Sequence, residues 1–256
     1  KRGGAAWGTV QSPDPGVITA EVAVAVDNDG NPQIAYRDAG VARLKLAKFL
    51  GAWSVQIVEA GSFLLGGFAL DADGRAVLTY QDVPTASLKL ASWTGVGWST
   101  GTLDSSGGRV SALELSVAQV PRLIYSDDVG LRLLRGPGLI VDSGVSVASR
   151  PAVAQDGNGT QWVAYVDAVT GKLRVGNLAQ GLAALDDATA SGGIALDGAG
   201  RAFVAYQSGG RLKYARHTGV AWTTGTIDAD GTVGEAASVA IDGAGSLYVA
   251  YYDSTR

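Results

Sequence analysis

The chain has 256 residues, of which 46% are hydrophobic and 17% charged, and its net charge is −4. Charged residues make up about 25% of an average soluble protein, so this composition predicts a packed chain and excludes a disordered one. Lys and Arg never stand more than two in a row, which argues against the concentrated cationic surface that a nucleic-acid partner requires. No apolar run approaches the roughly 18 residues of a membrane-spanning helix, so we expect no membrane insertion.

Cysteine and methionine are both absent. Without cysteine the chain has no disulfides, thiolate metal ligands or cysteine nucleophiles, and it tolerates any redox compartment. The first residues are Lys1-Arg2-Gly3, which we interpret as the start of a processed chain whose signal peptide has been removed. We therefore expect an extracellular or cell-surface location.

A pattern of four short strands recurs along the chain. In its first copy, residues 24–27 and 34–38 flank the tight turn Asn28-Asp29-Gly30, residues 44–47 form a third strand, and a fourth begins at Trp53. Alternating apolar residues with β-branched and aromatic enrichment predict strands, and Asp-Gly predicts a hairpin turn. The first and second strands recur at residues 68–71 and 78–82, 113–115 and 123–127, 153–156 and 163–167, 194–197 and 204–208, and 239–242 and 249–253. The third strand recurs at residues 88–91, 131–134, 173–176 and 212–215, and the fourth begins again at Trp98 and Trp222.

Each second strand carries a tyrosine, and these tyrosines recur every 40 to 45 residues. They are Tyr36, Tyr80, Tyr125, Tyr165, Tyr206 and Tyr251. Periods of 40 to 50 residues built of short strands are typical of propeller blades. Because the tyrosines lie in apolar strands, we expect all six rings to be buried and structural.

The six units resemble six-bladed β-propeller repeats, especially the short tandem propeller repeats common in secreted and cell-surface bacterial proteins. The resemblance implies an all-β, six-bladed propeller with mostly four-stranded blades, forming one domain over residues 1–256. Its last blade would combine residues 1–15, with Trp7 in the outermost strand, and residues 237–256. That blade lacks a recognisable third strand, so we expect it to have three strands or a shortened third one.

Charged residues repeat in two positions. Cations stand in the third strands at Lys45, Lys89, Arg132, Arg174 and Lys213, and acids end most second strands. These residues could form a charged ring for an ionic ligand, but a repeat in nearly every unit favours Asp–Lys pairing within or between blades. We place any ligand at the end of the sheets that holds the loops between second and third strands, because these loops and the linkers between units vary. The predicted ligand-binding residues are Arg37, Asp38, Gln81, Asp82, Asp127, Asp128, Asp167 and Asp253.

The sequence contains no recognisable catalytic or metal-binding motif, and we expect no cofactor. His217 is the only histidine, and it occupies the position of Phe49 and Trp93 in other units. No G-x-S-x-G motif is present, and adjacent acids such as Asp186 and Asp187 point to opposite faces of a strand. The Asp-Gly turns resemble the start of a calcium loop, but they lack the glutamate that such a loop needs, which favours simple hairpin turns.

The repeated tryptophans at the fourth strands predict packing between blades more than stacking on a sugar. Trp93 and Trp162 break this pattern, so we expect them to be the exposed rings. Fucose-binding six-bladed lectins are similar in outline, but they use an Arg, a Glu and a Trp at each sugar site. The third strands here carry no Glu, which argues against a fucose site.

Two functions follow from this reading. The main prediction is a non-enzymatic binding or interaction module that recognises a glycan or a protein partner through loops on a rigid scaffold. The alternative is a polysaccharide-acting hydrolase or lyase of propeller fold.

Overall fold

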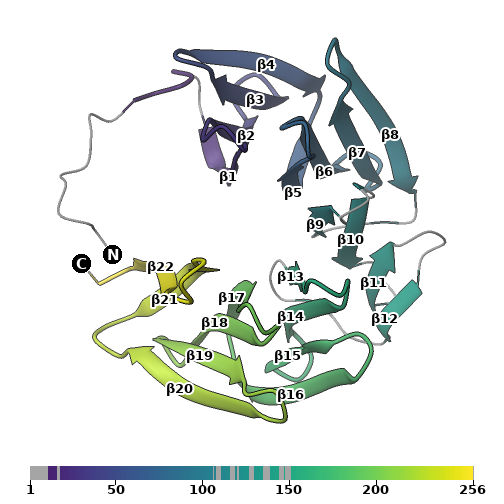
Figure 1. Ribbon diagram of the computed structural model, residues 1–256. Coiled ribbons are helices and arrows are strands. Elements are labelled where there is room, and N and C mark those ends of the chain that lie inside the picture. Colours follow the sequence, from purple (N-terminus) through teal and green to yellow (C-terminus); the bar gives the residue numbers. More distant parts are fainter. Residues whose placement is uncertain are drawn as a thin grey trace. The chain divides into compact units, whose positions relative to one another are not determined.

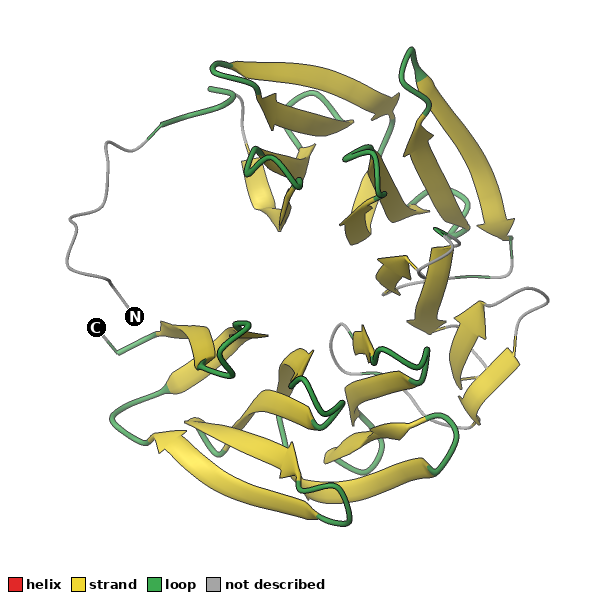
Figure 2. Cartoon of the chain, in the orientation of Figure 1, coloured by secondary structure: helices red, strands yellow, loops and turns green. Residues whose placement is uncertain are grey.

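The computed structural model describes residues 11–15, 18–105, 107, 111–115, 119, 121–126, 130–134, 139–143, 147 and 151–255. These residues form strands and loops and no helix, as Figure 2 shows. A helix long and apolar enough to cross a membrane is accordingly absent from the described part of the chain.

The strands form six antiparallel sheets, labelled in Figure 1, in which neighbours along the chain are neighbours in the sheet. The first sheet holds β1 (Ile18–Val26), β2 (Pro32–Asp38), β3 (Arg43–Phe49) and β4 (Trp53–Ala60), and the second holds β5 (Phe63–Leu70), β6 (Ala76–Asp82), β7 (Leu88–Trp93) and β8 (Trp98–Asp104). The third holds β9 (Ser111–Leu115), β10 (Pro121–Ser126), β11 (Gly130–Leu134) and β12 (Leu139–Ser143), and the fourth holds β13 (Ala152–Gln155), β14 (Gln161–Asp167), β15 (Lys172–Asn177) and β16 (Gly181–Asp187). The fifth holds β17 (Ala190–Leu196), β18 (Ala202–Ser208), β19 (Arg211–His217) and β20 (Trp222–Asp228), and the sixth holds β21 (Val233–Ile241) and β22 (Leu247–Asp253). The predicted all-β repeat of mostly four-stranded units is thus confirmed.

The chain separates into two compact units, Lys1–Leu115 and Ser116–Arg256. Within the described residues the sixth sheet has two strands, fewer than the three that the sequence predicts. Residues 1–10, including Trp7, lie outside the described part of the chain. Completion of the last blade by the N-terminal residues, and a single domain over residues 1–256, therefore stay predictions.

An Asp-x-x-Gly turn joins the first and second strands in five of the sheets. In the first of them, the Asp27 carboxylate accepts hydrogen bonds from the backbone N–H groups of Asp29, at 3.1 Å, and Asn31, at 2.8 Å. Gly30 closes the turn with a φ of +83°, a value that glycine adopts without steric cost. The predicted hairpin turns are confirmed, and we call the end of each sheet that holds them the Asp-x-x-Gly end.

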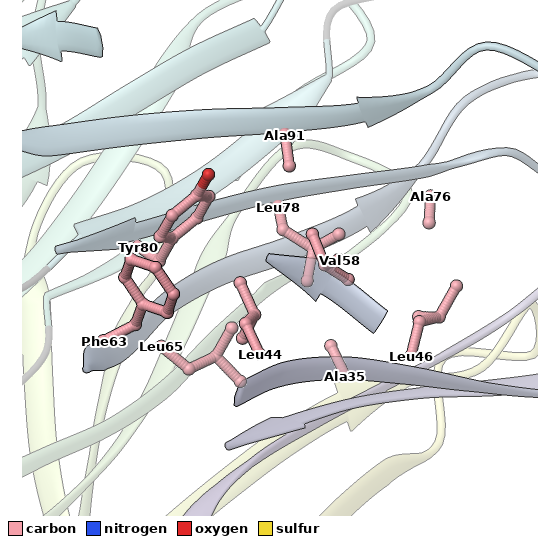
Figure 3. Packing of buried hydrophobic residues seen from close by; sticks show 10 residues of the cluster. All are labelled: Ala35, Leu44, Leu46, Val58, Phe63, Leu65, Ala76, Leu78, Tyr80 and Ala91. Carbon is pink, nitrogen blue, oxygen red and sulfur yellow. The ribbon is translucent and has the colours of Figure 1, made fainter. Parts of the chain in front are cut away.

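The core of the first unit lies between its first two sheets. Figure 3 shows Leu44 and Leu46 from β3 packed against Leu78 and Tyr80 from β6 and Phe63 from β5. All five side chains are buried, because strand alternation directs every second residue to this face. Full burial of one such leucine contributes about 1.5–3 kcal/mol to folding.

Glycines in the second unit let the first strands of neighbouring sheets approach closely. A Cβ atom on Gly192 of β17 would lie 2.8 Å from the Cβ of Ala237 in β21 and 2.7 Å from the carbonyl oxygen of Ala205. The register of β17 against β18 also shifts between Ser191 and Ile194. A side chain at position 192 would therefore push β17 and β21 apart.

In several sheets, a tyrosine of the second strand and a lysine of the third strand contact an acidic residue that precedes the sheet in the chain. Asp186, at the end of β16, accepts hydrogen bonds from the Tyr206 hydroxyl in β18, at 3.0 Å, and from the Lys213 ammonium in β19. Equivalent contacts join Tyr36 and Lys45 to Asp14, Tyr80 and Lys89 to Glu59, and Tyr251 to Asp228. We call Asp14, Glu59, Asp186 and Asp228 the intersheet acids.

Five of the six tyrosines are buried as expected, but Tyr251 is 38% exposed. The prediction for Tyr251 is wrong because no third strand covers β22 among the described residues. Burial, followed by the hydrogen bond to the intersheet acid, raises the pKa of Tyr36, Tyr80 and Tyr206. The hydrogen bond from Lys213 lowers the pKa of Asp186 despite partial burial. At Asp186 the two shifts indicate a neutral phenol bound to an ionised carboxylate.

Candidate functional site

Three of the predicted ligand-binding acids cap the turns that follow their strands. The Asp38 carboxylate accepts the N–H of Gly40 at 3.0 Å, and Asp167 accepts that of Val169 at 3.0 Å. Asp253 accepts the backbone N–H of Thr255 at 2.9 Å. Asp38 also binds Lys45 at 2.6 Å, and this hydrogen bond lowers the pKa of Asp38.

Three more of these residues have partners within the chain. Arg37 forms an ion pair with Glu21 at 3.1 Å. The side chain of Gln81 donates to the carbonyl of Ala86 at 3.2 Å, and Asp82 accepts a hydrogen bond from Thr85 at 2.8 Å. Asp127 and Asp128 lie outside the described residues. Every predicted ligand residue that the structure describes is thus engaged in turns or ion pairs, and a ligand at this end stays a prediction.

Cavities lie at the other end of the sheets. Three of them open between neighbouring sheets at the Asp-x-x-Gly end, with volumes of about 430, 280 and 80 Å³. The two larger ones belong to the second unit, between the fourth and fifth sheets and between the fifth and sixth. Clefts with convergent polar groups are the usual location of ligand sites, so these cavities are the better candidates.

The cavity of about 280 Å³ contains the only histidine of the chain, and we call it the His217 cavity. His217 ends β19 and packs against Trp222, with ring centroids 5.1 Å apart. Phe49–Trp53 and Trp93–Trp98 form the same pair in the first and second sheets, at 5.3 and 5.5 Å. His217 therefore places an ionisable ring where two other sheets use an aromatic ring that only packs.

Trp162 of β14 also lines the His217 cavity and packs against the histidine ring. Its ring centroid lies 5.1 Å from that of His217 and 5.9 Å from that of Trp222. The prediction that Trp162 is exposed is wrong, because this cluster leaves it only 5% exposed. Its indole Nε1 is buried and has no hydrogen-bond partner among the described residues. An unpaired buried N–H is costly, so this group is a donor suited to a ligand oxygen.

Charged groups of both signs line the same cavity. Arg201 lines the cavity and donates from Nε to Asp197 at 2.8 Å, a contact that does not use the two terminal nitrogens of its guanidinium. Asp156 accepts the backbone N–H groups of Asn158 and Thr160 with Oδ1, both at 2.9 Å. The second carboxylate oxygen of Asp156 is not used by this turn. The cavity thus combines one imidazole, one guanidinium, one carboxylate and one indole N–H.

No three His, Asp or Glu side chains within the described ranges lie close enough together to hold a metal ion. Among the side chains of the His217 cavity, an imidazole can transfer a proton and a guanidinium can stabilise negative charge.

The comparisons with solved structures identify the architecture as a β-propeller. The chain is similar to the virginiamycin B lyase of Staphylococcus aureus, with 12% identity and a TM-score of 0.60, over 89% of this chain and 75% of that one. It is also similar to a streptogramin B lyase, with 11% identity and a TM-score of 0.62, over 89% of this chain and 74% of that one. Neither a scan against protein-family models nor a search of curated proteins finds a match.

These comparisons contradict the predicted non-enzymatic binding module, because both similar propellers are lyases. They favour the alternative of a hydrolase or lyase of propeller fold. The prediction is wrong because a propeller fold hosts many functions, and because side chains that meet between sheets form no linear motif in the sequence. A resemblance to lectins or to a particular repeat family gains no support from either structure.

The cavity brings together residues that the sequence analysis did not connect. Asp156, Trp162, Arg201 and His217 come from two sheets and are far apart in the chain. One available signal was His217, a histidine at a repeat position that otherwise holds Phe49 or Trp93. Trp162 broke the repeat pattern of tryptophans but was expected to be exposed, and Arg201 gave no signal. Only the packing of adjacent sheets places these residues at one cavity.

Proposed function

We propose that this chain is a lyase of propeller fold whose reaction takes place in the His217 cavity. Two observations support the proposal: the similar propellers are lyases, and the cavity holds a proton-transferring side chain beside a cation. A lyase can break a bond by removing a proton from a carbon next to a carbonyl, a step that needs a base and a stabiliser of the resulting oxyanion.

In this proposal His217 is the general base. Its imidazole takes the proton from the carbon beside the carbonyl, and the electron pair of that C–H bond forms a new carbon–carbon double bond. The leaving group on the neighbouring carbon departs with the electrons of its bond and afterwards receives a proton. Positioned bases of this kind accelerate proton transfer by about 10²–10⁴-fold.

Arg201 and Trp162 bind the oxygen on which negative charge develops. The guanidinium keeps its terminal N–H groups available, since Asp197 engages only Nε. The buried indole N–H supplies a second donor. Donors held in place before the reaction stabilise a developing oxyanion without reorganising during the step.

The observation that carries the proposal is the exchange of a packing ring for an imidazole. Where the second sheet pairs Trp93 with Trp98, the fifth sheet pairs His217 with Trp222. Packing alone is satisfied by Phe or Trp at this position, so the imidazole adds a capacity for proton transfer that the fold does not require.

The test uses the substitution His217→Phe, which restores the residue that the first sheet carries at Phe49. The purified chain is incubated with virginiamycin B and, separately, with a uronate-containing polysaccharide. Products are followed by mass spectrometry and by the ultraviolet absorbance of a double bond conjugated to a carbonyl. We expect the unsubstituted chain to form an elimination product and His217→Phe to lose at least 100-fold in kcat.

Trp93→Phe is the matched control, because it changes the same repeat position in a sheet without a histidine. It should keep full activity, and both variants should keep the thermal midpoint of the unsubstituted chain within a few degrees. Equal activity of His217→Phe and the unsubstituted chain would refute the assigned role. Absence of any elimination product from either substrate class would overturn the proposed function.

A further inference from the structure

The larger cavity of the second unit shares Ala199 and Arg201 with the His217 cavity, and its other described lining residues are different. It has a volume of about 430 Å³ and lies between the fifth and sixth sheets, where β21 packs beside β17, β18 and β19. Figure 1 shows the turn between β21 and β22 next to these strands. Ile241 and Leu247 flank that turn and form one wall, and Phe203 and Arg216 lie on the facing sheet. The volume is in the range of small-molecule sites.

The charge of this cavity is positive. Arg216 and Arg201 line it together with Asp197, which is already bound to Arg201. Asp197 has a lowered pKa: its hydrogen bonds and ion pair with Arg201 outweigh the opposing effect of burial, so it stays ionised. Arg216 is exposed, and its guanidinium makes no hydrogen bond or ion pair within the described part of the chain. The guanidinium of Arg216 is therefore the uncompensated charge in the cavity.

An aromatic surface lies directly beside that charge. Phe203 and Arg216 are opposite each other on β18 and β19, so their side chains share one face of the sheet. The Phe203 ring stacks on Tyr214, with centroids 5.3 Å apart and an interplanar angle of 10°. This stack holds the ring in place, and Phe203 lines the cavity although it is only 8% exposed.

The pair Phe203–Arg216 is special to the fifth sheet. The equivalent cross-strand pairs are Gln33–Lys48 in the first sheet, Val77–Ser92 in the second and Trp162–Asn177 in the fourth. Of these four described pairs, Phe203–Arg216 alone joins an aromatic ring to a cation. The side-chain amide of Gln33 also donates a hydrogen bond to the carbonyl of Gly74 at 2.8 Å. This bond joins the first and second sheets at the cavity of about 80 Å³ between them.

We propose that the cavity between the fifth and sixth sheets is a second binding site, for a small organic anion with a flat apolar body. Arg216 binds the anionic group, Phe203 contacts the flat body, and Ile241 and Leu247 cover its other side. The site is distinct from the His217 cavity, and it requires no catalytic step. The ligands that fit this site have an aryl or similarly flat group that carries a carboxylate, sulfonate or phosphate.

The test measures binding by isothermal titration calorimetry with benzoate, benzenesulfonate and phenyl phosphate. Benzamide and benzylamine are the neutral and cationic counterparts of the same size. We expect at least one of the three anions to bind, benzamide to bind at least tenfold more weakly, and benzylamine not to bind. Affinity for the anion should fall as salt rises, because an ion pair at a partly open site is screened. The ranking of the three anions by affinity identifies the anionic group that the site prefers.

Arg216→Gln should weaken anion binding at least tenfold, since it removes the charged hydrogen-bond donor of the site. Arg216→Lys should retain part of the affinity, and Phe203→Val, which restores the residue at Val77, should weaken it. Lys48→Gln is the matched control, because Lys48 holds the equivalent position in the first sheet. It should bind the anion as the unsubstituted chain does.

The result that overturns the inference is equal affinity for benzoate and benzamide, or unchanged anion binding in Arg216→Gln. Loss of binding in His217→Phe would also overturn it, since the anion would then occupy the His217 cavity. Retained anion binding in an inactive His217→Phe variant supports two separate sites. Because Arg216 is exposed, its variants should fold, and circular dichroism checks this.

Discussion

The intersheet acid Asp186 offers a sharp test of what holds neighbouring sheets together. The substitution Asp186→Asn keeps the size of the side chain and removes its charge. In the structure this carboxylate accepts the Tyr206 hydroxyl at 3.0 Å and binds the Lys213 ammonium, and the side chains of Asp186 and Lys213 are 29% and 22% exposed. Tyr206 itself is fully buried, so its hydroxyl has little access to water as a replacement partner.

The expected cost comes from these two contacts. A hydrogen bond to a charged group contributes about 1.5–3 kcal/mol, and an ion pair that is partly open to water contributes about 0.2–1 kcal/mol. We therefore expect Asp186→Asn to lower the free energy of unfolding by about 2–4 kcal/mol. At about 2–4 °C per kcal/mol for a chain of this size, the thermal midpoint should fall by roughly 5–15 °C. Urea unfolding followed by circular dichroism measures the free energy directly.

The adjacent residue Asp187 supplies the control. It points to the other face of β16 and pairs with Lys172 at 2.8 Å, but its side chain is 80% exposed. Asp187→Asn should therefore cost less than about 0.5 kcal/mol. A double-mutant cycle of Asp186→Asn with Tyr206→Phe should show a coupling of about 0.5–3 kcal/mol. If both Asn variants unfold at the same urea concentration, the tyrosine–lysine–acid contact does not stabilise the fold and our reasoning is refuted.

Three further predictions concern the whole chain. Tyr80→Ala should cost about 3–5 kcal/mol in urea unfolding, since its ring is fully buried in the core of the first unit; a cost below 1 kcal/mol would contradict that packing. The contribution of Tyr36, Tyr80 and Tyr206 to the free energy of unfolding should be fully present below about pH 10. Above that pH it should fall by up to about 1.4 kcal/mol per pH unit for each tyrosine, because the unfolded chain releases phenolic protons that the folded chain retains. Tyr206→Phe should make this decline in the free energy of unfolding less steep. Deletion of residues 1–12 should lower the thermal midpoint if they complete the sheet of β21 and β22, because an unpaired strand edge would otherwise remain; an unchanged midpoint would contradict the predicted last blade.

Much of the fold could be predicted from local sequence. The alternation around Tyr36 and Tyr80 places those rings on the buried face of a second strand, because side chains alternate along any strand. The turn from Asp27 to Gly30 is likewise local, since its carboxylate binds its own backbone and its glycine adopts a positive φ. Strands without a tryptophan at their start, such as β12 and β16, escaped prediction because their apolar residues form no distinct pattern.

The candidate site depended on tertiary structure. The sequence by itself determined a repeat of short strands, six equivalent tyrosine positions of which five are buried, and the single histidine at a position that elsewhere holds Phe or Trp. Only the packing of one sheet on the next decided that Asp186 pairs with Tyr206, that Trp162 is buried against His217, and that Arg216 stands beside Phe203 at an open cavity. These contacts join residues 13 to 55 positions apart in the chain, and short-range patterns carry no information about such distances. For that reason the repeat predicts a propeller, while the chemistry of the propeller follows from which side chains meet between its sheets.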